Sequence, residues 1–123
     1  MPTARTDAAS ADLGLLQGTL DVMILKALSW GPLHGFGVAK WIHSTTDDVL
    51  QIDDGALYPA LHRMEHRGLI DADWDLTENK RRAKYYRLTT KGRQALRART
   101  SSWDRYSSAV SKVIHATVQP SAT

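Results

Sequence analysis

Three residues in one short segment have the types and the spacing of a zinc site. His62, Glu65 and His66 form the pattern His-x-x-Glu-His, in which two histidines four residues apart on a helix hold zinc and the glutamate acts on a water molecule. A catalytic zinc also needs a third protein ligand and an open position for water. The spacing indicates no third ligand, although a distant Glu78 or His34 could supply one. We therefore keep a zinc hydrolase as a remote alternative, because so short a pattern arises easily by chance.

The segment around this pattern is predicted to be a helix with one apolar face. Asp53 or Asp54 can cap its N-terminus, because the carboxylate accepts a hydrogen bond from a free amide of the first turn. Gly68 suits its C-terminal end. At helical spacing, the residues expected to face the core are Leu57, Leu61 and Met64. Those expected to face outward are Ala56, Pro59, Arg63 and His66, with Tyr58 and His62 at the flanks.

Two helices are predicted before this segment. Gly31 and Pro32 end the first one, because proline cannot continue a helix and disfavours helical geometry in the residue before it. Its apolar residues recur at spacings of three and four, and they are Leu16, Leu20, Met23, Ile24, Ala27 and Leu28. The second helix is shorter, and its inward residues are Val38, Ala39 and Ile42.

Two strands and a last helix are predicted after the segment. Apolar residues alternate with aspartates over 69–76, and the strand over 84–89 places Tyr86 and Leu88 on one face, so the two strands form a hairpin around a polar turn. A helix then starts near Thr89 or Thr90. Its heptad-like apolar seam, which Arg99 interrupts, consists of Leu96, Trp103, Tyr106, Val110 and Val113.

The composition is that of one soluble globular domain. The 123 residues are 42% hydrophobic and 24% charged, and a chain of this length can bury a modest core. Cysteine is absent, so neither a disulfide nor a thiolate metal site can form, which is compatible with the cytoplasm where we expect the protein to work. The apolar run of the first helix contains Gln17, Asp21 and Lys26, so it is not predicted to span a membrane.

Charge is distributed unevenly along the chain, although the formal net charge is only +3. Residues 80–99 hold nine of the sixteen basic residues and no acid, whereas residues 47–78 hold nine of the thirteen acids. A basic block of this kind is either a solvated surface or a site for a polyanion. The charge pattern alone favours neither interpretation.

The order of these elements is that of a winged helix-turn-helix, a mainly α fold with a small β component. Three helices are followed by a two-stranded wing and a long C-terminal helix, and in this architecture the third helix lies in the major groove of DNA. We expect a disordered tail over 1–12, the winged domain over 13–89, a dimerisation helix over 90–117 and a frayed tail over 118–123. We expect no catalytic site, metal or cofactor.

Double-stranded DNA is therefore the predicted partner. Arg63 is the candidate for contacting a base edge, because its guanidinium fork can bind guanine, although a phosphate contact suits it equally well. Residues at the tip of the wing and on its return strand can neutralise phosphates. The predicted DNA-binding residues are Ala56, Tyr58, Pro59, Arg63, His66, Lys80, Arg81, Arg82 and Lys84.

Four segments resemble the PadR family of bacterial transcriptional regulators. They are LLQGTLDVMILKAL, GPLHGFGVAKWI, GALYPALHRMEHRGLI and RRAKYYRLTTKGRQAL, and the resemblance extends from Leu15 to Val113. Its motifs are specific in combination, above all Leu57-Tyr58-Pro59 in the third helix and a Lys-Tyr-Tyr strand followed by Leu-Thr-x-x-Gly. The length is similar to that of the short subfamily with a single C-terminal helix.

The resemblance implies a homodimeric transcriptional repressor that a small molecule or a stress signal often releases from DNA. It implies a dimer interface between the first and last helices, and it places Tyr58 and Pro59 on the DNA-facing helix. It places Arg81, Arg82 and Lys84 on the wing.

Two residues depart from the pattern of the family. Ala56 stands where serine or threonine is usual, so a hydroxyl contact to DNA is absent there. Phe36 stands where tyrosine is common, which leaves a packing role and removes a phenol.

The last helix is predicted to join two copies of the chain. Trp103 is expected to anchor the interface, and the alternative is that it lines a pocket between subunits that binds a flat aromatic effector. Trp30, Trp41 and Trp74 are expected to be core or hinge residues. The predicted interface residues are Leu16, Leu20, Leu96, Trp103, Tyr106, Val110 and Val113. A winged helix that binds an acidic protein instead of DNA remains an alternative function.

Overall fold

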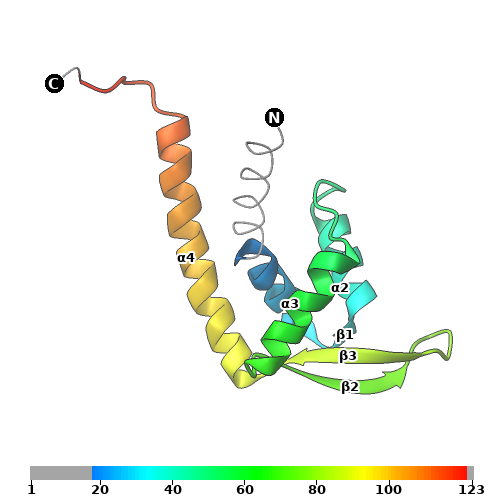
Figure 1. Ribbon diagram of the computed structural model, residues 1–123. Coiled ribbons are helices and arrows are strands. Elements are labelled where there is room, and N and C mark those ends of the chain that lie inside the picture. The colour runs from blue at the N-terminus through cyan, green and yellow to red at the C-terminus, as the bar shows by residue number, and fades with distance from the viewer. Residues whose placement is uncertain (1–17, 122–123) are drawn as a thin grey trace, which may run out of the picture.

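The computed structural model describes residues 18–121, and its elements follow the predicted order (Figure 1). A first helix over residues 18–27 continues into the short 3-10 helix η1 (Leu28–Trp30). The elements after it are β1 (Leu33–His34), α2 (Gly35–Thr45), α3 (Asp54–His66), β2 (Ile70–Leu76), β3 (Arg82–Leu88) and α4 (Thr90–Ile114). The predicted tail over 1–12 and Leu16 lie outside the described residues.

The predicted hairpin is confirmed, and the sheet has one strand more than expected. β2 and β3 pair antiparallel, with Ile70 opposite Leu88, and β1 pairs with the other edge of β3, so the strand order is β1-β3-β2. β1 is only two residues long, and so short a strand has no alternation of apolar and polar residues that could predict it. Its pairing anchors the start of α2 to the wing.

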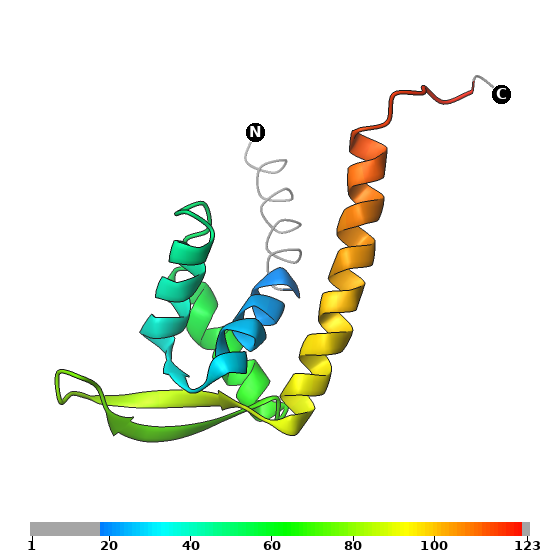
Figure 2. The same ribbon diagram turned by 180° about the vertical axis from the view of Figure 1, so that it is seen from behind.

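The core lies between the helices and one face of the sheet. In Figures 1 and 2, the first helix, α2 and α3 lie on the same side of the sheet, and α4 rises beside them from the end of the hairpin opposite its loop. The predicted core residues Leu57, Leu61 and Met64 are all at most 1% exposed, which confirms the inward face of α3. Within residues 18–121, no helix combines the length and the apolar character that crossing a membrane requires.

Two of the tryptophans expected to be core or hinge residues are on the surface, so the core interpretation is wrong for both. Trp30 is 69% exposed and Trp74 is 59% exposed. Trp74 lies in the second half of β2, where residues 73–76 are all exposed, and Figure 1 shows the loop end of the hairpin extending past the helices. Trp30 ends η1, and its ring centroid lies 5.5 Å from that of the half-buried Trp41.

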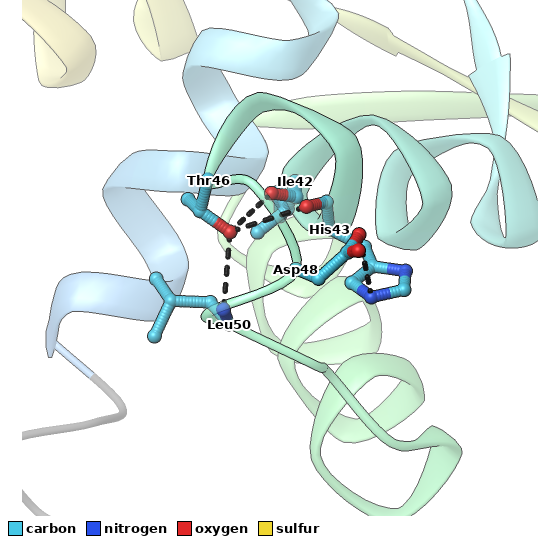
Figure 3. Close-up of polar contacts among 5 residues, drawn as sticks. All are labelled: Ile42, His43, Thr46, Asp48 and Leu50. Carbon is cyan, nitrogen blue, oxygen red and sulfur yellow. Dashed lines mark hydrogen bonds and ion pairs between the residues drawn. The ribbon is translucent and has the colours of Figure 1, made fainter.

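The connection from α2 to α3 is held by a set of local contacts (Figure 3). The Thr46 hydroxyl donates to the carbonyl of Ile42 at 2.9 Å and accepts from the amide of Leu50 at 3.0 Å. Asp48 Oδ1 lies 3.1 Å from His43 Nε2, and Asp48 has a positive φ of 68°. These contacts close the turn that follows α2.

α4 is joined to the body of the fold at a close backbone approach. The Thr89 hydroxyl caps the helix by accepting from the amide of Gly92 at 2.9 Å, and it donates to the carbonyl of Gly68 at 2.7 Å. A Cβ atom on Gly92 would lie 2.0 Å from the carbonyl oxygen of Leu69. Only glycine therefore fits where α4 crosses the end of α3.

We expect Gly92→Ala to destabilise the protein, although alanine is ordinarily the better helix former. The added methyl group must push the Leu69 backbone away, and overpacking of this kind costs about 1–3 kcal/mol of unfolding free energy. Urea unfolding measures the effect. Gly55→Ala is the matched control, because its Cβ would meet only the Asp53 carboxylate at 3.3 Å, a side chain that can turn aside. Equal stability of the two variants would contradict the close approach.

Candidate nucleic-acid interface

α3 turns one face to the core and the opposite face to solvent. Its Asp53 N-cap accepts from the amide of Ala56 at 2.9 Å, as predicted, and its buried residues are Leu57, Ala60, Leu61 and Met64. With 3.6 residues per turn, the direction opposite to these four passes through Gly55, Pro59, His62 and His66, and all are exposed. We call these four residues the outer face of α3.

The other predicted residues of α3 divide between surface and core. Tyr58 is 45% exposed and borders the outer face. Its ring packs on the first residue of α2, because a Cβ atom on Gly35 would lie 2.7 Å from Tyr58 Cε1. Ala56 was expected to face outward, but it is half buried and packs against the core. That expectation is wrong, because Ala56 lies on the flank of the helix beside Ala60.

The outward orientation expected of Arg63 is also wrong. Its Nη2 donates to Oδ1 of Asp21 in the first helix at 3.1 Å, and its side chain is 33% exposed. Asp21 is itself buried, so this arginine neutralises a carboxylate that water does not solvate. The guanidinium fork is therefore engaged within the chain and does not point along the outer face of α3.

His62 takes the outward position that the sequence interpretation gave to Arg63. Ala60 is fully buried, so it belongs to the inward face of α3. The side of the helix opposite to this face passes through His62 and not through Arg63. The signal was present in the sequence, since Ala60 is apolar and three residues after Leu57. The inward face was predicted from the large side chains Leu57, Leu61 and Met64, and the small side chain of Ala60 was not counted among them.

The tip of the wing presents exposed cations. The turn closes through the amide of Thr77, which donates to the carbonyl of Arg81 at 2.8 Å, and Lys80 adopts a positive φ of 58°. Lys80, Arg81 and Arg82 are all exposed, as predicted. The Arg82 guanidinium lies 5.0 Å from the centroid of the Trp74 ring, so a cation–π contact supports it on the strand opposite.

Lys84, predicted as a free wing cation, is paired with α3. Its Nζ donates to Glu65 Oε1 at 2.9 Å, and this hydrogen bond raises the pKa of Lys84 above its usual value. Arg87 further along β3 is paired with Asp73 of β2. Among the basic residues of the described hairpin, Lys80, Arg81 and Arg82 at its tip are the ones for which no ion pair is found, while Lys84 ties the wing to α3.

An exposed polar helix beside a basic hairpin has the dimensions of a DNA-binding surface, because an α-helix about 10–12 Å across fits a major groove about 12 Å wide. The sequence profile described as "Transcriptional regulator PadR-like family" matches residues 24–98, more than half of the chain. The chain belongs to this family.

Solved PadR-like structures are similar over most of the chain. A transcriptional regulator from Clostridium thermocellum is 30% identical, with 86% of this chain and 99% of that chain covered and a TM-score of 0.70. A PadR family regulator from Eggerthella lenta DSM 2243 is 31% identical, with 94% and 99% covered and a TM-score of 0.68. A protein of Lysinibacillus sphaericus named "Uncharacterized protein X" is 27% identical over 72% of this chain and 82% of the relative. The winged-helix prediction is confirmed, and DNA-binding regulation is the activity of the family.

One residue of the zinc pattern in this PadR-like chain, Glu65, already has a partner within the chain. Glu65 would have to act on a water molecule, but its carboxylate accepts the hydrogen bond from Lys84. His62 and His66 are exposed on the outer face of α3. Across residues 18–121, no three His, Cys, Asp or Glu residues lie where they could hold a metal ion together.

α4 of the PadR-like chain carries an exposed apolar stripe beyond the body of the fold. The predicted residues Trp103, Tyr106, Val110 and Val113 are between 37% and 77% exposed. A groove of about 470 Å³ separates this part of α4 from the first helix. Its lining residues include Asp21, Val22, Arg99, Trp103 and Tyr106.

Two predicted interface residues belong to the core of the single chain. Leu20 is 2% exposed and packs in the core of its own chain, which leaves it little surface for a partner. Leu96 is half buried and packs against the same core. Both residues lie close to the body of the fold, where their own chain covers them.

We expect Tyr86 to make the stability of the protein sensitive to alkali. Tyr86 is 5% exposed, and burial raises the pKa of its phenol, an effect that the nearby Lys84 opposes. The unfolded chain ionises this tyrosine at about pH 10, whereas the folded chain keeps it protonated. The unfolding free energy therefore falls as the pH rises from that value through the higher pKa of the folded state.

Urea unfolding as a function of pH measures this effect, and Tyr86→Phe is the informative variant. Phenylalanine cannot ionise, so the variant should lose less stability than the wild type above about pH 10. Parallel pH profiles for the two proteins would contradict the assignment of the alkaline loss to Tyr86.

Proposed function

We propose that this PadR-like chain is a homodimeric transcriptional repressor that binds an inverted-repeat operator in the cytoplasm. The observation that carries the proposal is the ion pair between Lys84 of β3 and Glu65 of α3, which holds the hairpin with the basic tip beside the helix that carries the outer face. These two surfaces come from segments that a single DNA duplex can contact together.

The outer face of α3 would lie in the major groove. His62 and His66 can donate to base or phosphate acceptors, and Tyr58 and Pro59 add an apolar edge. Lys80, Arg81 and Arg82 would contact phosphates, and the counterions they release supply affinity that does not depend on sequence. In this proposal α3 provides specificity and the wing provides most of the electrostatic attraction.

The apolar stripe of α4 supports a second copy as the partner. Trp103 and Tyr106 are 44% and 53% exposed in the single chain, with their ring centroids 6.4 Å apart. Large aromatic residues dominate the energetics of protein interfaces. A two-fold axis at this helix would present two α3 helices to half-sites about one turn of DNA apart, hence an inverted repeat. Such a dimer on a promoter would block the polymerase.

The groove beside Trp103 is the proposed site for an aromatic effector. Its volume of about 470 Å³ lies in the range of small-molecule pockets, about 300–1,000 Å³. Trp103 and Tyr106 offer flat rings on which such a ligand could stack. An effector that favours a different arrangement of the two subunits would weaken binding to the operator by its differential affinity for the two states.

We expect the protein to prefer its own upstream region over random duplex, with affinity that falls steeply with salt. Arg81→Ala should weaken binding to both duplexes and reduce the salt slope by about one, because one phosphate contact is lost. Arg105→Ala, which removes the same charge from the exposed middle of α4, is the control and should keep the slope. Fluorescence anisotropy over a salt series measures both.

Two results of this binding experiment would contradict the proposal. No DNA binding at low salt would contradict the proposed function and favour the protein-interaction module. Binding without preference, even across the whole upstream region, would contradict a role for this chain at its own promoter. A reporter fused to that promoter separates repression from activation, since a repressor's deletion raises expression.

We expect Trp103→Ala to weaken the dimer by about 30-fold, equivalent to about 2 kcal/mol, because it removes an aromatic anchor. Sedimentation equilibrium measures the dimer dissociation constant. The same variant should lose binding of a planar aromatic dye, measured by equilibrium dialysis. Arg105→Ala again serves as the control. An unchanged dimer constant would contradict the α4 interface, and unchanged dye binding would contradict the effector site.

A further inference from the structure

Asp21 is a carboxylate shared by two distant parts of the chain. It is 7% exposed, and among residues 18–121 it is the buried residue that carries a charge. Its Oδ1 accepts from Arg63 Nη2 of α3 at 3.1 Å, and its Oδ2 accepts from Arg99 Nη1 of α4 at 3.5 Å. The first helix therefore joins the recognition helix to the long C-terminal helix through the two oxygens of one side chain.

The contact with Arg99 attaches α4 beyond its first turns. Nearer its start, the helix is held by the junction at Thr89 and Gly92 and by Leu96, which packs against the core. Arg99 lies about 15 Å along the helix from Thr89, at 1.5 Å per residue. This more distant contact limits how far α4 can tilt about its start. Figures 1 and 2 show α4 extending well beyond the body of the fold, so a small change of direction moves its far end considerably.

We propose that Asp21 is a positioning residue for operator recognition. By fixing α4 relative to α3, it sets the distance between the two recognition helices of the dimer and hence the half-site spacing that the dimer accepts. This inference rests on the proposed function, because it assumes a dimer that joins through α4 and binds two half-sites.

The location of the pair links it to the groove beside Trp103. Asp21 and Arg99 line that groove together with Trp103 and Tyr106. A groove ligand that displaces Arg99 from Asp21 frees the direction of α4, and it leaves Arg63 paired with Asp21. The structure thus places the contact that controls spacing in the wall of the candidate effector site.

Operators whose half-sites are moved apart one base pair at a time test the proposal. The wild-type dimer should bind one spacing at least tenfold more tightly than its neighbours. Asp21→Asn and Arg99→Gln should each reduce this preference at least threefold. Asp48→Asn removes a carboxylate from an exposed pair with His43 at the end of α2, which involves neither Arg63 nor Arg99, and should keep the full preference. Arg99→Lys retains the charge and should restore most of it.

A loss of stability alone would give a different pattern from the one expected. It would lower the affinity for every spacing by the same factor and leave the preference intact. Circular dichroism and sedimentation identify any variant that fails to fold or to dimerise. If Asp21→Asn fails to fold, Arg99→Gln decides, since it leaves Asp21 paired with Arg63. An unchanged spacing preference in folded Arg99→Gln would overturn the proposal.

A distance measurement tests the same contact without DNA. The chain has no cysteine, so His62→Cys and Ser108→Cys place one spin label on α3 and one on α4 of the same chain. Dilution with unlabelled protein isolates the distance within one chain. The distribution should be narrow in the otherwise wild-type protein and broader when Asp21→Asn or Arg99→Gln is added. Equal widths would overturn the positioning role even if the wild-type protein bound no operator, a result that would contradict the proposed function separately.

Discussion

The burial of one stripe of α3 is the constraint on which the other features depend. Leu57, Ala60, Leu61 and Met64 are all at most 1% exposed, and each large side chain contributes about 1.5–3 kcal/mol by leaving water. This burial fixes the rotation of α3 about its own axis. Once that rotation is fixed, a different set of residues must face solvent, and the flanking residues must find partners on neighbouring elements.

The flanking residues of α3 turn this constraint into a rigid frame. Arg63 on one flank pairs with Asp21 of the first helix, and Glu65 on the other flank pairs with Lys84 of the wing. Each pair spans two elements and is only partly exposed, so solvent screens it less than a surface ion pair. α3 is thereby tied to an element on each side, to the first helix through Arg63 and to the hairpin through Glu65.

The sequence predicted the elements and most of the core, because spacing and caps are local properties. Asp53 and Thr89 cap the helices as expected, and the hairpin alternation is correct. The roles of the charged residues were less predictable. Arg63 and Lys84 are paired with residues 42 and 19 positions away, and no local pattern indicates such partners. Alternation put Trp74 on the same face of β2 as the buried Ile70, but alternation cannot show where a strand extends beyond the helices that cover it, and Trp74 is exposed.

The division of α3 into faces also has an evolutionary consequence. His62 and His66 are exposed, whereas their neighbours Arg63 and Glu65 maintain contacts inside the chain. In the proposed mode of DNA binding, substitutions at the two histidines would therefore change which operator is bound while the fold keeps its stability. Changes at the two flanking residues would need a compensating change at Asp21 or Lys84. A lineage of such regulators could thus acquire new target genes through a few outer positions of one helix.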